Sequence, residues 1–183
     1  MRIISGDFKG FKLNEPKNKN IRPTTDKVKE AIFDSLQFEI ANKTFLDLFS
    51  GSGQMGIEAL SRKAGFVVFV DESFDSVNLL KSNISKLGSS VKSKFSVVNK
   101  STSDFLKLNK TEFNFVFMDP PYNKGILPEL ILKIANHICP NGTLICEHES
   151  KLQLPEKVKD LIVFKNKRYG AISITFYKKM TTL

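Results

Sequence analysis

The sequence predicts an α/β fold with a doubly wound, mostly parallel sheet. Apolar runs of strand length alternate with amphipathic stretches along the 183 residues, an order that favours parallel strands joined by crossover helices. A glycine-rich loop separates one of these strands from the next helix, and a later strand ends at Asp-Pro-Pro-Tyr. Sheets of this kind bind ligands at the carboxyl ends of their strands, so we expect both loops at one binding edge.

The expected elements follow the chain in a regular order. Residues 2–4 and 11–13 flank two glycines and predict a small N-terminal hairpin, and Thr24 or Thr25 can cap the helix that follows. Hydrophobic periodicity and turn residues then predict, in chain order, a strand over 45–49, a helix over 57–63, a strand over 66–70, a helix over 74–87, strands over 95–98 and 113–118, a helix over 127–138, a turn over 140–142 into a strand over 143–147, and a closing hairpin of 161–164 and 172–177 joined through 165–170.

The glycine-rich loop has the spacing of a nucleotide-binding βαβ unit. Gly51, Gly53 and Gly56 fit G-x-G-x-x-G, and Asp71 ends the next apolar run. In such units glycines let the backbone approach the ligand, and the later acid holds ribose hydroxyls. Asp47, just before the loop, could bind an amine, which S-adenosylmethionine (SAM) carries and a pyrophosphate lacks. The alternative is a plain tight turn, which the flanking strand, helix and acid disfavour.

The second loop is Asp119-Pro120-Pro121-Tyr122, which follows the apolar run over 113–118. Two prolines must end the strand, because neither can donate a hydrogen bond to a neighbouring strand. A carboxylate, bare carbonyls and an aromatic ring then stand together, a set that suits a flat molecule with an exocyclic amino group. The alternative is a strand-ending turn with a packed tyrosine.

The combination of the strand carrying Asp47, the glycine loop and Asp-Pro-Pro-Tyr resembles the SAM-dependent amino-methyltransferases. Three flanking segments narrow the resemblance: Arg-Ile-Ile-Ser-Gly-Asp-Phe-Lys-Gly-Phe-Lys-Leu over 2–13, Arg-Pro-Thr-Thr-Asp-Lys-Val-Lys-Glu-Ala-Ile-Phe over 22–33, and Gly-Ile-Glu-Ala-Leu-Ser-Arg over 56–62. From Arg2 to about Lys178 the chain resembles the RsmD family, bacterial 16S ribosomal RNA (guanine-N2)-methyltransferases. It departs from the family pattern at Ser5, Lys27 and Lys29.

The resemblance implies a Rossmann-like fold of the class I SAM-dependent methyltransferases, with an antiparallel last strand. We expect one domain over 1–183, with a basic hairpin extension over 1–22 and a catalytic core over 23–183. SAM is the implied cofactor, and N2 of a guanine in 16S ribosomal RNA is the implied methyl acceptor. Ser101 stands where the family carries Asn or Asp near the adenine of SAM. The implied catalytic residues are Asp119, Pro120, Pro121 and Tyr122, the cofactor-binding residues Asp47, Gly51, Ser52, Gly53, Asp71 and Ser101, and the residues near the substrate Arg22 and Thr24.

Positive charge is concentrated at the two ends of the chain. Residues 1–29 carry eight Lys and Arg against three Asp and Glu, and residues 151–183 carry eight against two, whereas residues 30–150 carry twelve against fourteen. Basic residues that reach phosphates add salt-dependent affinity for nucleic acid. We therefore expect Lys9 and Lys12 to contact RNA; the alternative is that these lysines only serve solubility.

The composition is that of an ordinary globular domain, with 41% hydrophobic and 26% charged residues. The sequence contains neither an apolar stretch long enough to span a membrane nor a secretory signal. Cys139 and Cys146 are expected to be reduced core thiols, and neither they nor His137 and His148 have metal-ligand spacing. We expect a cytoplasmic monomer without a metal site, whose partner is 16S ribosomal RNA or the assembling small ribosomal subunit.

Three other functions share parts of this pattern. A DNA adenine-N6 methyltransferase would have the same core motifs, but usually needs a target-recognition region for which this chain has no room. An NAD-dependent oxidoreductase would explain the glycine loop and Asp71, but not Asp119 to Tyr122. A non-catalytic RNA-binding module would explain only the basic ends.

Overall fold

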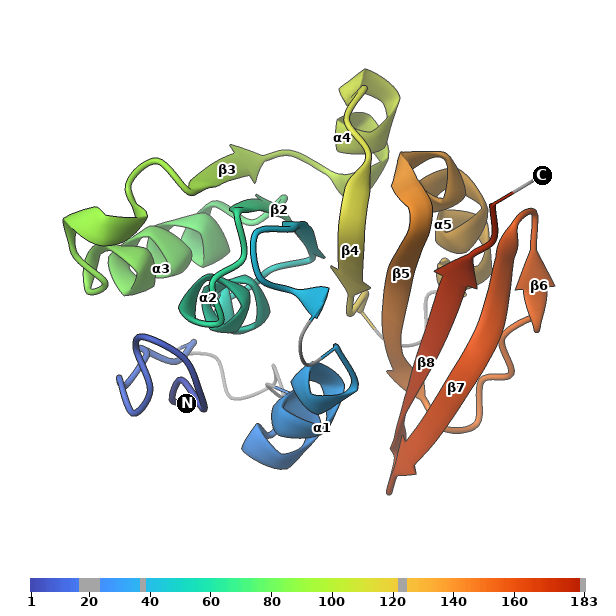
Figure 1. Cartoon of the computed structure of the whole chain (residues 1–183), viewed down its shortest axis with the longest axis horizontal. Helices are drawn as coiled ribbons and strands as arrows, with labels where there is room; N and C mark the ends of the chain where they lie inside the picture. The colour runs from blue at the N-terminus through green and yellow to red at the C-terminus, as the bar shows by residue number, and fades with distance from the viewer. Residues whose placement is uncertain (17–23, 37–38, 122–124, 182–183) are drawn as a thin grey trace.

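The computed structural model describes residues 1–16, 24–36, 39–121 and 125–181. Within these residues eight strands form one sheet in the order β3-β2-β1-β4-β5-β8-β7-β6, with helices on both faces (Figure 1). The strands are β1 (Thr44–Leu48), β2 (Phe66–Asp71), β3 (Phe95–Asn99), β4 (Phe113–Met118), β5 (Ile138–Glu149), β6 (Lys157–Val158), β7 (Leu161–Tyr169) and β8 (Ile172–Lys179).

The first five strands of the sequence pair in parallel, and the last three pair antiparallel. This arrangement confirms the predicted fold class. The last strand, β8, is antiparallel as predicted and lies between β5 and β7, and the short β6 adds a third antiparallel strand beyond β7. The order changes direction at β1, which has β2 on one side and β4 on the other. Ligand sites in open α/β sheets lie at such switch points, beyond the carboxyl ends of the strands.

The helices divide the core into two clusters of buried side chains. The helices α1 (Asp26–Leu36), α2 (Gln54–Ser61) and α3 (Phe74–Ser85) cover one face, and α4 (Thr102–Leu108) and α5 (Leu127–Ile134) cover the other. Short 3-10 helices lie over Ser89–Val91 and Ala135–His137. Alternate residues of a strand point to opposite faces: Phe115 and Phe117 of β4 face the first cluster, and Val116 and Met118 face the second.

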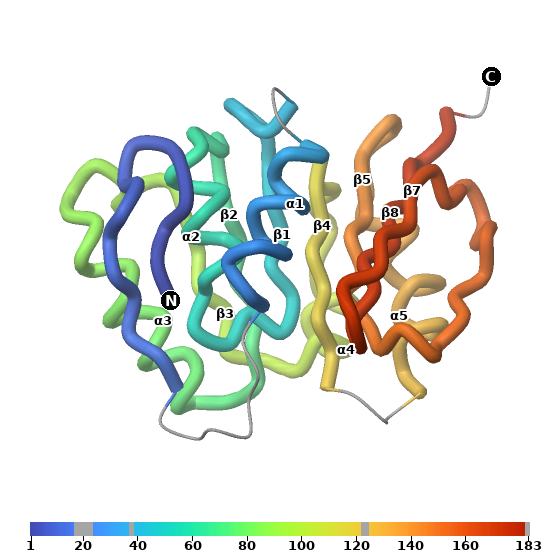
Figure 2. The backbone as a smooth tube through the Cα atoms, turned by 90° about the horizontal axis from the view of Figure 1, so that it is seen from below, coloured from blue at the N-terminus to red at the C-terminus, as the bar shows by residue number. Residues whose placement is uncertain are grey.

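Residues 1–16 form an extension that packs against α2 and α3 (Figure 2). The expected hairpin is present only as one antiparallel bridge between Arg2 and Lys12. The division into an extension over 1–22 and a core over 23–183 stays a prediction, because its boundary lies outside the described residues. Ile3 and Leu13 are nonetheless buried in the first core cluster, so the described part of the extension is packed into the body of the protein.

The buried carboxylate of Glu58 on α2 fastens this extension. Its oxygens accept hydrogen bonds from the backbone N–H groups of Ile4 at 2.8 Å and Ser5 at 3.0 Å. It also pairs with Arg62 at 2.9 Å and lies 3.8 Å from the buried ammonium of Lys29. Burial lowers the pKa of Lys29, and the charges of Glu58 and Asp26 oppose that shift. Since a buried charge is costly unless it is paired, this cluster fixes how the extension sits on α2.

Several predicted boundaries were wrong. The helix expected over 127–138 ends at Ile134, and Ile138 already belongs to β5. The turn expected over 140–142 lies inside β5, where Asn141 has a φ of 60° and the pairing with β4 shifts register. β7 of the closing hairpin extends through the expected linker to Tyr169, whereas β8 begins at Ile172 as predicted, so that only residues 170 and 171 separate the two strands. The helix predicted over 57–63, after the glycine loop, begins earlier, at Gln54.

Candidate active site

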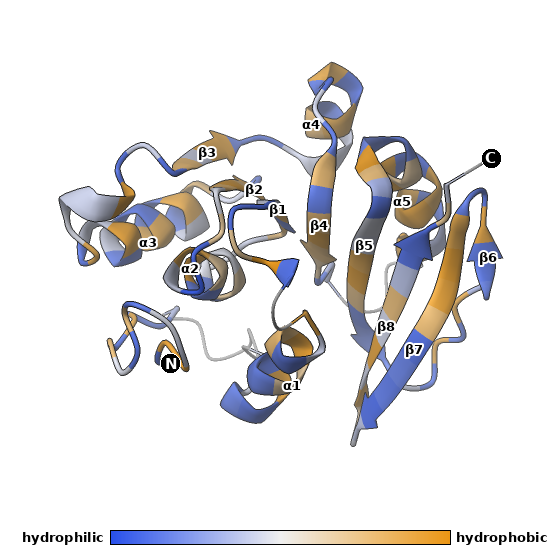
Figure 3. Ribbon diagram, in the orientation of Figure 1, coloured by the Kyte–Doolittle hydropathy of each residue, from blue (hydrophilic) through white to orange (hydrophobic). Residues whose placement is uncertain are grey.

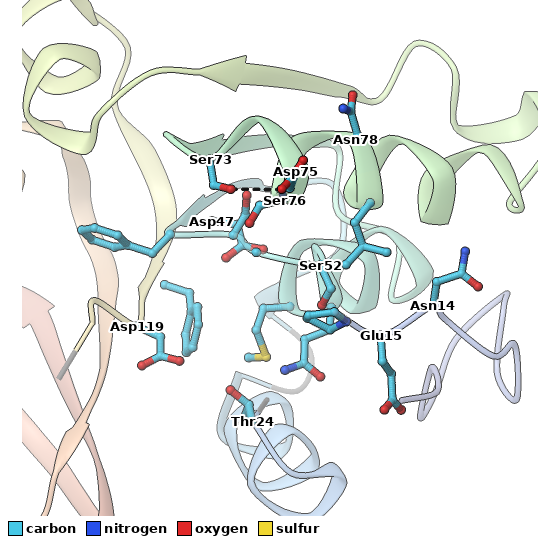
Figure 4. Close-up of a pocket in the computed structure, with 18 residues that line it drawn as sticks. Asn14, Glu15, Thr24, Asp47, Ser52, Ser73, Asp75, Ser76, Asn78 and Asp119 are labelled. Atoms are coloured by element: carbon cyan, nitrogen blue, oxygen red, sulfur yellow. Dashed lines mark hydrogen bonds between the residues drawn. The ribbon is translucent and has the colours of Figure 1, made fainter. Parts of the chain in front are cut away.

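A cavity of about 790 Å³ opens beyond the carboxyl ends of β1 and β4. Figure 4 shows side chains entering it from several elements: Asp47 from β1, Thr24 from the start of α1, and Asp119 from the end of β4. Asn14 and Glu15 of the extension line another wall. The structure therefore brings Asp119 of the second predicted motif to the same cavity as Asp47 and the glycine loop. Its lining residues are Asn14, Glu15, Pro16, Thr24, Asp47, Phe49, Ser50, Gly51, Ser52, Gln54, Met55, Ser73, Asp75, Ser76, Asn78, Leu79, Phe117 and Asp119.

The glycine loop turns sharply out of β1. Gly51 and Gly53 have φ angles of 53° and 79°, in the left-handed region that glycine adopts without steric cost. A Cβ on Gly51 would meet only a backbone oxygen 4.0 Å away, which leaves that backbone accessible to a ligand. A Cβ on Gly53 would lie 2.1 Å from Leu80, and one on Gly56 would lie 2.2 Å from the ring of Phe69. The latter two glycines thus allow close protein packing, and the predicted contact of Gly53 with the cofactor stays a prediction.

The carboxylate of Asp71 holds this loop in place. One oxygen accepts the N–H of Gly51 at 2.7 Å, and the other accepts the N–H of Ser73 at 2.9 Å. A carboxylate offers about four lone-pair positions, so Asp71 can accept further hydrogen bonds. Its predicted role as acceptor for ribose hydroxyls stays a prediction. Ser52 of the same loop is buried and lines the cavity.

Asp47 presents a buried carboxyl group to the cavity. It accepts the N–H of Gly56 at 2.8 Å. Burial raises its pKa to about 8, with a further rise from the charge of Asp71 and an opposing effect from the Gly56 hydrogen bond. A cationic ligand in the cavity would favour the ionised form, because an opposite charge nearby offsets the cost of desolvation.

Asp119 lies beside a second carboxyl group, that of Glu147, at the carboxyl edge of the sheet. Met118 of β4 pairs with Cys146 of β5, so Asp119 and Glu147 follow neighbouring positions. Burial raises the pKa of Asp119 well above its ordinary value, and the charges of Glu147 and then Asp47 raise it further. The hydroxyl of Thr24 donates to Glu147 at 2.8 Å. Asp119, Glu147 and Thr24 thus form a polar cluster beside the cavity.

The structure separates some predicted site residues from the cavity. Ser101 caps α4, where its hydroxyl accepts from the N–H of Asp104 at 3.1 Å and donates to the carboxylate of Asp104 at 2.8 Å; its predicted contact with adenine stays a prediction. Lys9 and Lys12 are exposed on the extension. The predicted residues Tyr122 and Arg22 lie outside the described residues. After Asp119, Pro120 is buried and Pro121 is exposed.

Sequence reasoning does not identify several residues of the site, Glu147, Asn14 and Glu15 among them. The sequence predicts Glu147 only as a strand residue, although an acid within the apolar run of β5 is a detectable signal. Asn14 and Glu15 line the cavity, whereas the extension was expected only to meet RNA. Asn14 is held by Asn83 of α3, whose side-chain oxygen accepts its backbone N–H at 2.7 Å.

The described residues, 1–16, 24–36, 39–121 and 125–181, contain no group of three His, Cys, Asp or Glu side chains arranged to hold a metal ion. Among the helices of the same residues, none has the length and apolar character needed to cross a membrane.

Comparison with known proteins places the chain in a family. The family model described as conserved hypothetical protein 95 matches residues 1–178. The chain belongs to this family, the RsmD family. An RsmD-family relative, ribosomal RNA small subunit methyltransferase D of Haemophilus influenzae, is 36% identical over 184 residues, which cover 97% of this chain and 93% of the relative. The resemblance seen in the sequence is thereby confirmed.

The fold of this RsmD-family chain is similar to that of solved structures over most of its length. The structure of Escherichia coli yhhF matches with a TM-score of 0.89 and 30% identity, covering 100% of this chain and 99% of that one. An RNA methyltransferase of Salinibacter ruber, solved in complex with S-adenosyl-L-homocysteine, matches with a TM-score of 0.66 over 88% of this chain and 96% of that one. Its identity is 13%, so this likeness shows the fold alone. That fold is the Rossmann-like fold of SAM-dependent methyltransferases.

Proposed function

We propose that the protein transfers a methyl group from SAM to the exocyclic N2 amino group of a guanine in 16S ribosomal RNA. One observation carries the proposal: Asp119 lines the same cavity as Asp47 and the glycine loop. An acceptor for an amino group and a set of groups suited to SAM therefore share one space. The names of RsmD-family relatives, which refer to ribosomal RNA of the small subunit, support RNA as the substrate.

The residues around the cavity fit SAM. The buried carboxyl of Asp47 suits its methionyl ammonium, and Asp71 has lone pairs left for the ribose hydroxyls. Gly51 supplies open backbone between these two acids, and Ser52 lines the cavity beside it. SAM would supply an electrophilic methyl group on its sulfonium, so the protein needs no covalent intermediate of its own.

Asp119 would position the amino group that is methylated. The lone pair of guanine N2 is delocalised into the ring, so the amine is a weak nucleophile. Hydrogen bonds from its two N–H groups to the Asp119 carboxylate and the Pro120 carbonyl would favour a pyramidal nitrogen with its lone pair aimed into the cavity. Positioning of this kind can contribute up to roughly 7–11 kcal/mol to catalysis. The released proton would pass to Asp119 or to water, and Tyr122 would stack on the base.

RNA would reach the cavity along the extension. Lys9 and Lys12 are exposed there, while Asn14 and Glu15 of the same segment line the cavity. Phosphate contacts by these lysines would thus lie close in the chain to the residues that border the cofactor. A base splayed from a loop is the expected target, since it needs no unpairing.

The test is a methylation assay with SAM and either 16S ribosomal RNA or immature small subunits. Mass spectrometry of the digested nucleosides should show N2-methylguanosine, and the Asp119→Ala variant should form far less of it. Calorimetry with SAM and with NAD should show binding of SAM only. Formation of N6-methyladenine in DNA, with no modified guanine in either RNA substrate, would instead support the DNA methyltransferase alternative.

A further inference from the structure

The second half of β7 carries basic side chains that the proposed chemistry does not use. Lys165 is half-buried, and Lys167 is exposed. Figure 3 shows the hydrophilic part of β7 at the end of the strand that lies toward α1. The ammonium of Lys165 donates to the hydroxyl of Ser35 on α1 at 2.8 Å. Lys165 therefore borders the helix whose first turn follows Thr24 of the candidate active site.

The strand register places Lys167 in line with the active site. Lys167 pairs with Ile174 of β8, and Ile174 pairs with Glu147 of β5. Lys167 thus lies two strand spacings from Glu147, or roughly 10 Å across the sheet. Ile174 belongs to the core cluster beneath α1. Residues that are directly paired share a face of the sheet, so Lys167 is on the face that carries α1, Glu147 and the extension.

Lys165 and Lys167 form a pair of like charges. They are two residues apart on one strand, so both side chains leave the same face. Burial lowers the pKa of Lys165, and the positive charge of Lys167 lowers it further. In contrast, Lys178 and Lys179 of β8 pair with Glu39 and with Glu112 and Asp160. Among the ion pairs found in the described residues, none includes Lys165 or Lys167, so an anion that neutralises both would be favoured.

An aromatic side chain lies beside the two lysines. Phe164 is 51% exposed, and its ring centroid lies 6.0 Å from that of the buried Phe176. The register of β7 shifts at this point, between Val163 and Lys165. An exposed ring next to cationic groups is the combination that single-stranded nucleic acid recognises, through base stacking and phosphate contacts.

We propose that Phe164, Lys165 and Lys167 form a second RNA-binding surface, which holds a single-stranded segment on the side of the active site opposite the N-terminal extension. Figure 2 shows the extension on one side of α1 and the β7–β8 hairpin on the other. RNA held on both sides would cross the cavity between them. The inference rests on the proposed function and adds that the target guanine is flanked by bound RNA in both directions.

The test compares two double variants, each of which removes two positive charges. Lys165→Gln with Lys167→Gln changes the proposed surface. Lys157→Gln with Arg168→Gln is the matched control: Lys157 lies on the edge strand β6, and Arg168 follows Lys167 on β7 and so points to the opposite face. Binding of a fluorescently labelled single-stranded RNA is measured by anisotropy at several salt concentrations. SAM binding is measured by calorimetry and should be the same for all three proteins.

Loss of two phosphate contacts should weaken RNA binding about tenfold in about 50 mM salt and lower the slope of log affinity against log salt by roughly 1.4. The control should change far less. Equal losses in both variants, or no loss in the first, would overturn the inference. If the first variant fails to fold, Lys167→Gln alone serves, with about a threefold expected loss. If the wild-type protein methylates RNA and the first variant binds RNA normally, this surface is refuted but the proposed function stands. If the wild-type protein neither binds nor methylates RNA, the proposed function is refuted as well.

Discussion

Asp119 and Glu147 lie beside each other at the carboxyl edge of the sheet, one residue beyond the paired positions Met118 and Cys146. The charge of Glu147 raises the pKa of Asp119 in addition to the effect of burial. The proposed acceptor for the substrate amine is therefore harder to ionise than an ordinary aspartate. The hydrogen bond from Thr24 to Glu147 connects this pair to the start of α1.

Replacement of Asp119 should separate chemistry from cofactor binding. Asp119→Ala should lower kcat by roughly 10²–10⁴-fold, the contribution of a well-placed proton acceptor, while the Kd for SAM changes little. Asp119→Asn should retain more activity, because its carbonyl still accepts a hydrogen bond. Single-turnover methylation and calorimetry measure the two effects. Wild-type turnover by Asp119→Ala would show that the catalytic group lies elsewhere.

Glu147→Gln should change the pH dependence of the reaction. Removal of the neighbouring negative charge lowers the pKa of Asp119, so the ionised form persists to lower pH. The acid limb of the kcat/KM profile should move down by roughly one pH unit. Glu149→Gln, on the same strand, is the matched control and should leave the limb in place. A limb that stays at the wild-type pH in Glu147→Gln would show that Asp119 does not control it.

Asp47→Asn should weaken SAM binding by roughly 10- to 100-fold, because a hydrogen bond to a charged group contributes roughly 1.5–3 kcal/mol. Below the folded-state pKa of about 8, binding of the SAM ammonium should also release a proton from Asp47 of the wild type. Calorimetry in buffers of different ionisation enthalpy measures that proton. Release of a full proton by the Asn variant would argue against this pairing.

Asp47→Asn should also change how the free energy of unfolding depends on pH. The pKa of Asp47 is about 8 in the folded protein and about 3.9 in an unfolded chain. The folded state therefore binds the proton more tightly, and this contribution to stability is lost as the pH rises from about 4 to 8. The Asp47→Asn variant does not lose this contribution, so its free energy of unfolding should increase relative to that of the wild type as the pH rises across that range. Urea unfolding at several pH values provides the measurement; a constant difference would contradict the raised pKa.

Gly56→Ala should destabilise the fold through packing alone. Gly56 lies within α2, and a Cβ there would come within 2.2 Å of the Phe69 ring. Overpacking of this kind typically costs about 1–3 kcal/mol of unfolding free energy. Gly10→Ala has no clash but a φ of 87°, so it measures instead the cost of backbone strain, which Gly56 does not incur. Denaturant unfolding compares the two, and a Gly56→Ala protein as stable as wild type would mean that Phe69 moves aside freely.

The parallel core was predictable because its strands are apolar runs with clear ends. β4 has the predicted bounds, since buried residues precede two prolines that cannot pair. α4 was missed because it has seven residues, of which only Phe105 and Leu106 are large and buried apolar groups. The extent of β5 could not be predicted, since Pro140 to Gly142 normally end a strand; here the left-handed Asn141 and the register shift against β4 accommodate them.

The site was predictable where its chemistry is local in sequence. Asp47 and the glycines lie in one loop, and Asp119 is fixed by the prolines that follow it. Glu147 could not be assigned, because its position beside Asp119 depends on the pairing of β4 with β5. The role of Asp71 as a brace for the Gly51 backbone likewise depends on the parallel pairing of β1 with β2.

The bond between Thr24 and Glu147 joins residues 123 positions apart in the chain. Closing a loop of this length has an entropic cost that the contacts of β5 must offset. During synthesis, a chain that ends before β5 already contains Asp47, the glycine loop and Asp71, yet it lacks the neighbour that completes the acceptor side. The acceptor side of the site is therefore complete only once β5 has joined the sheet.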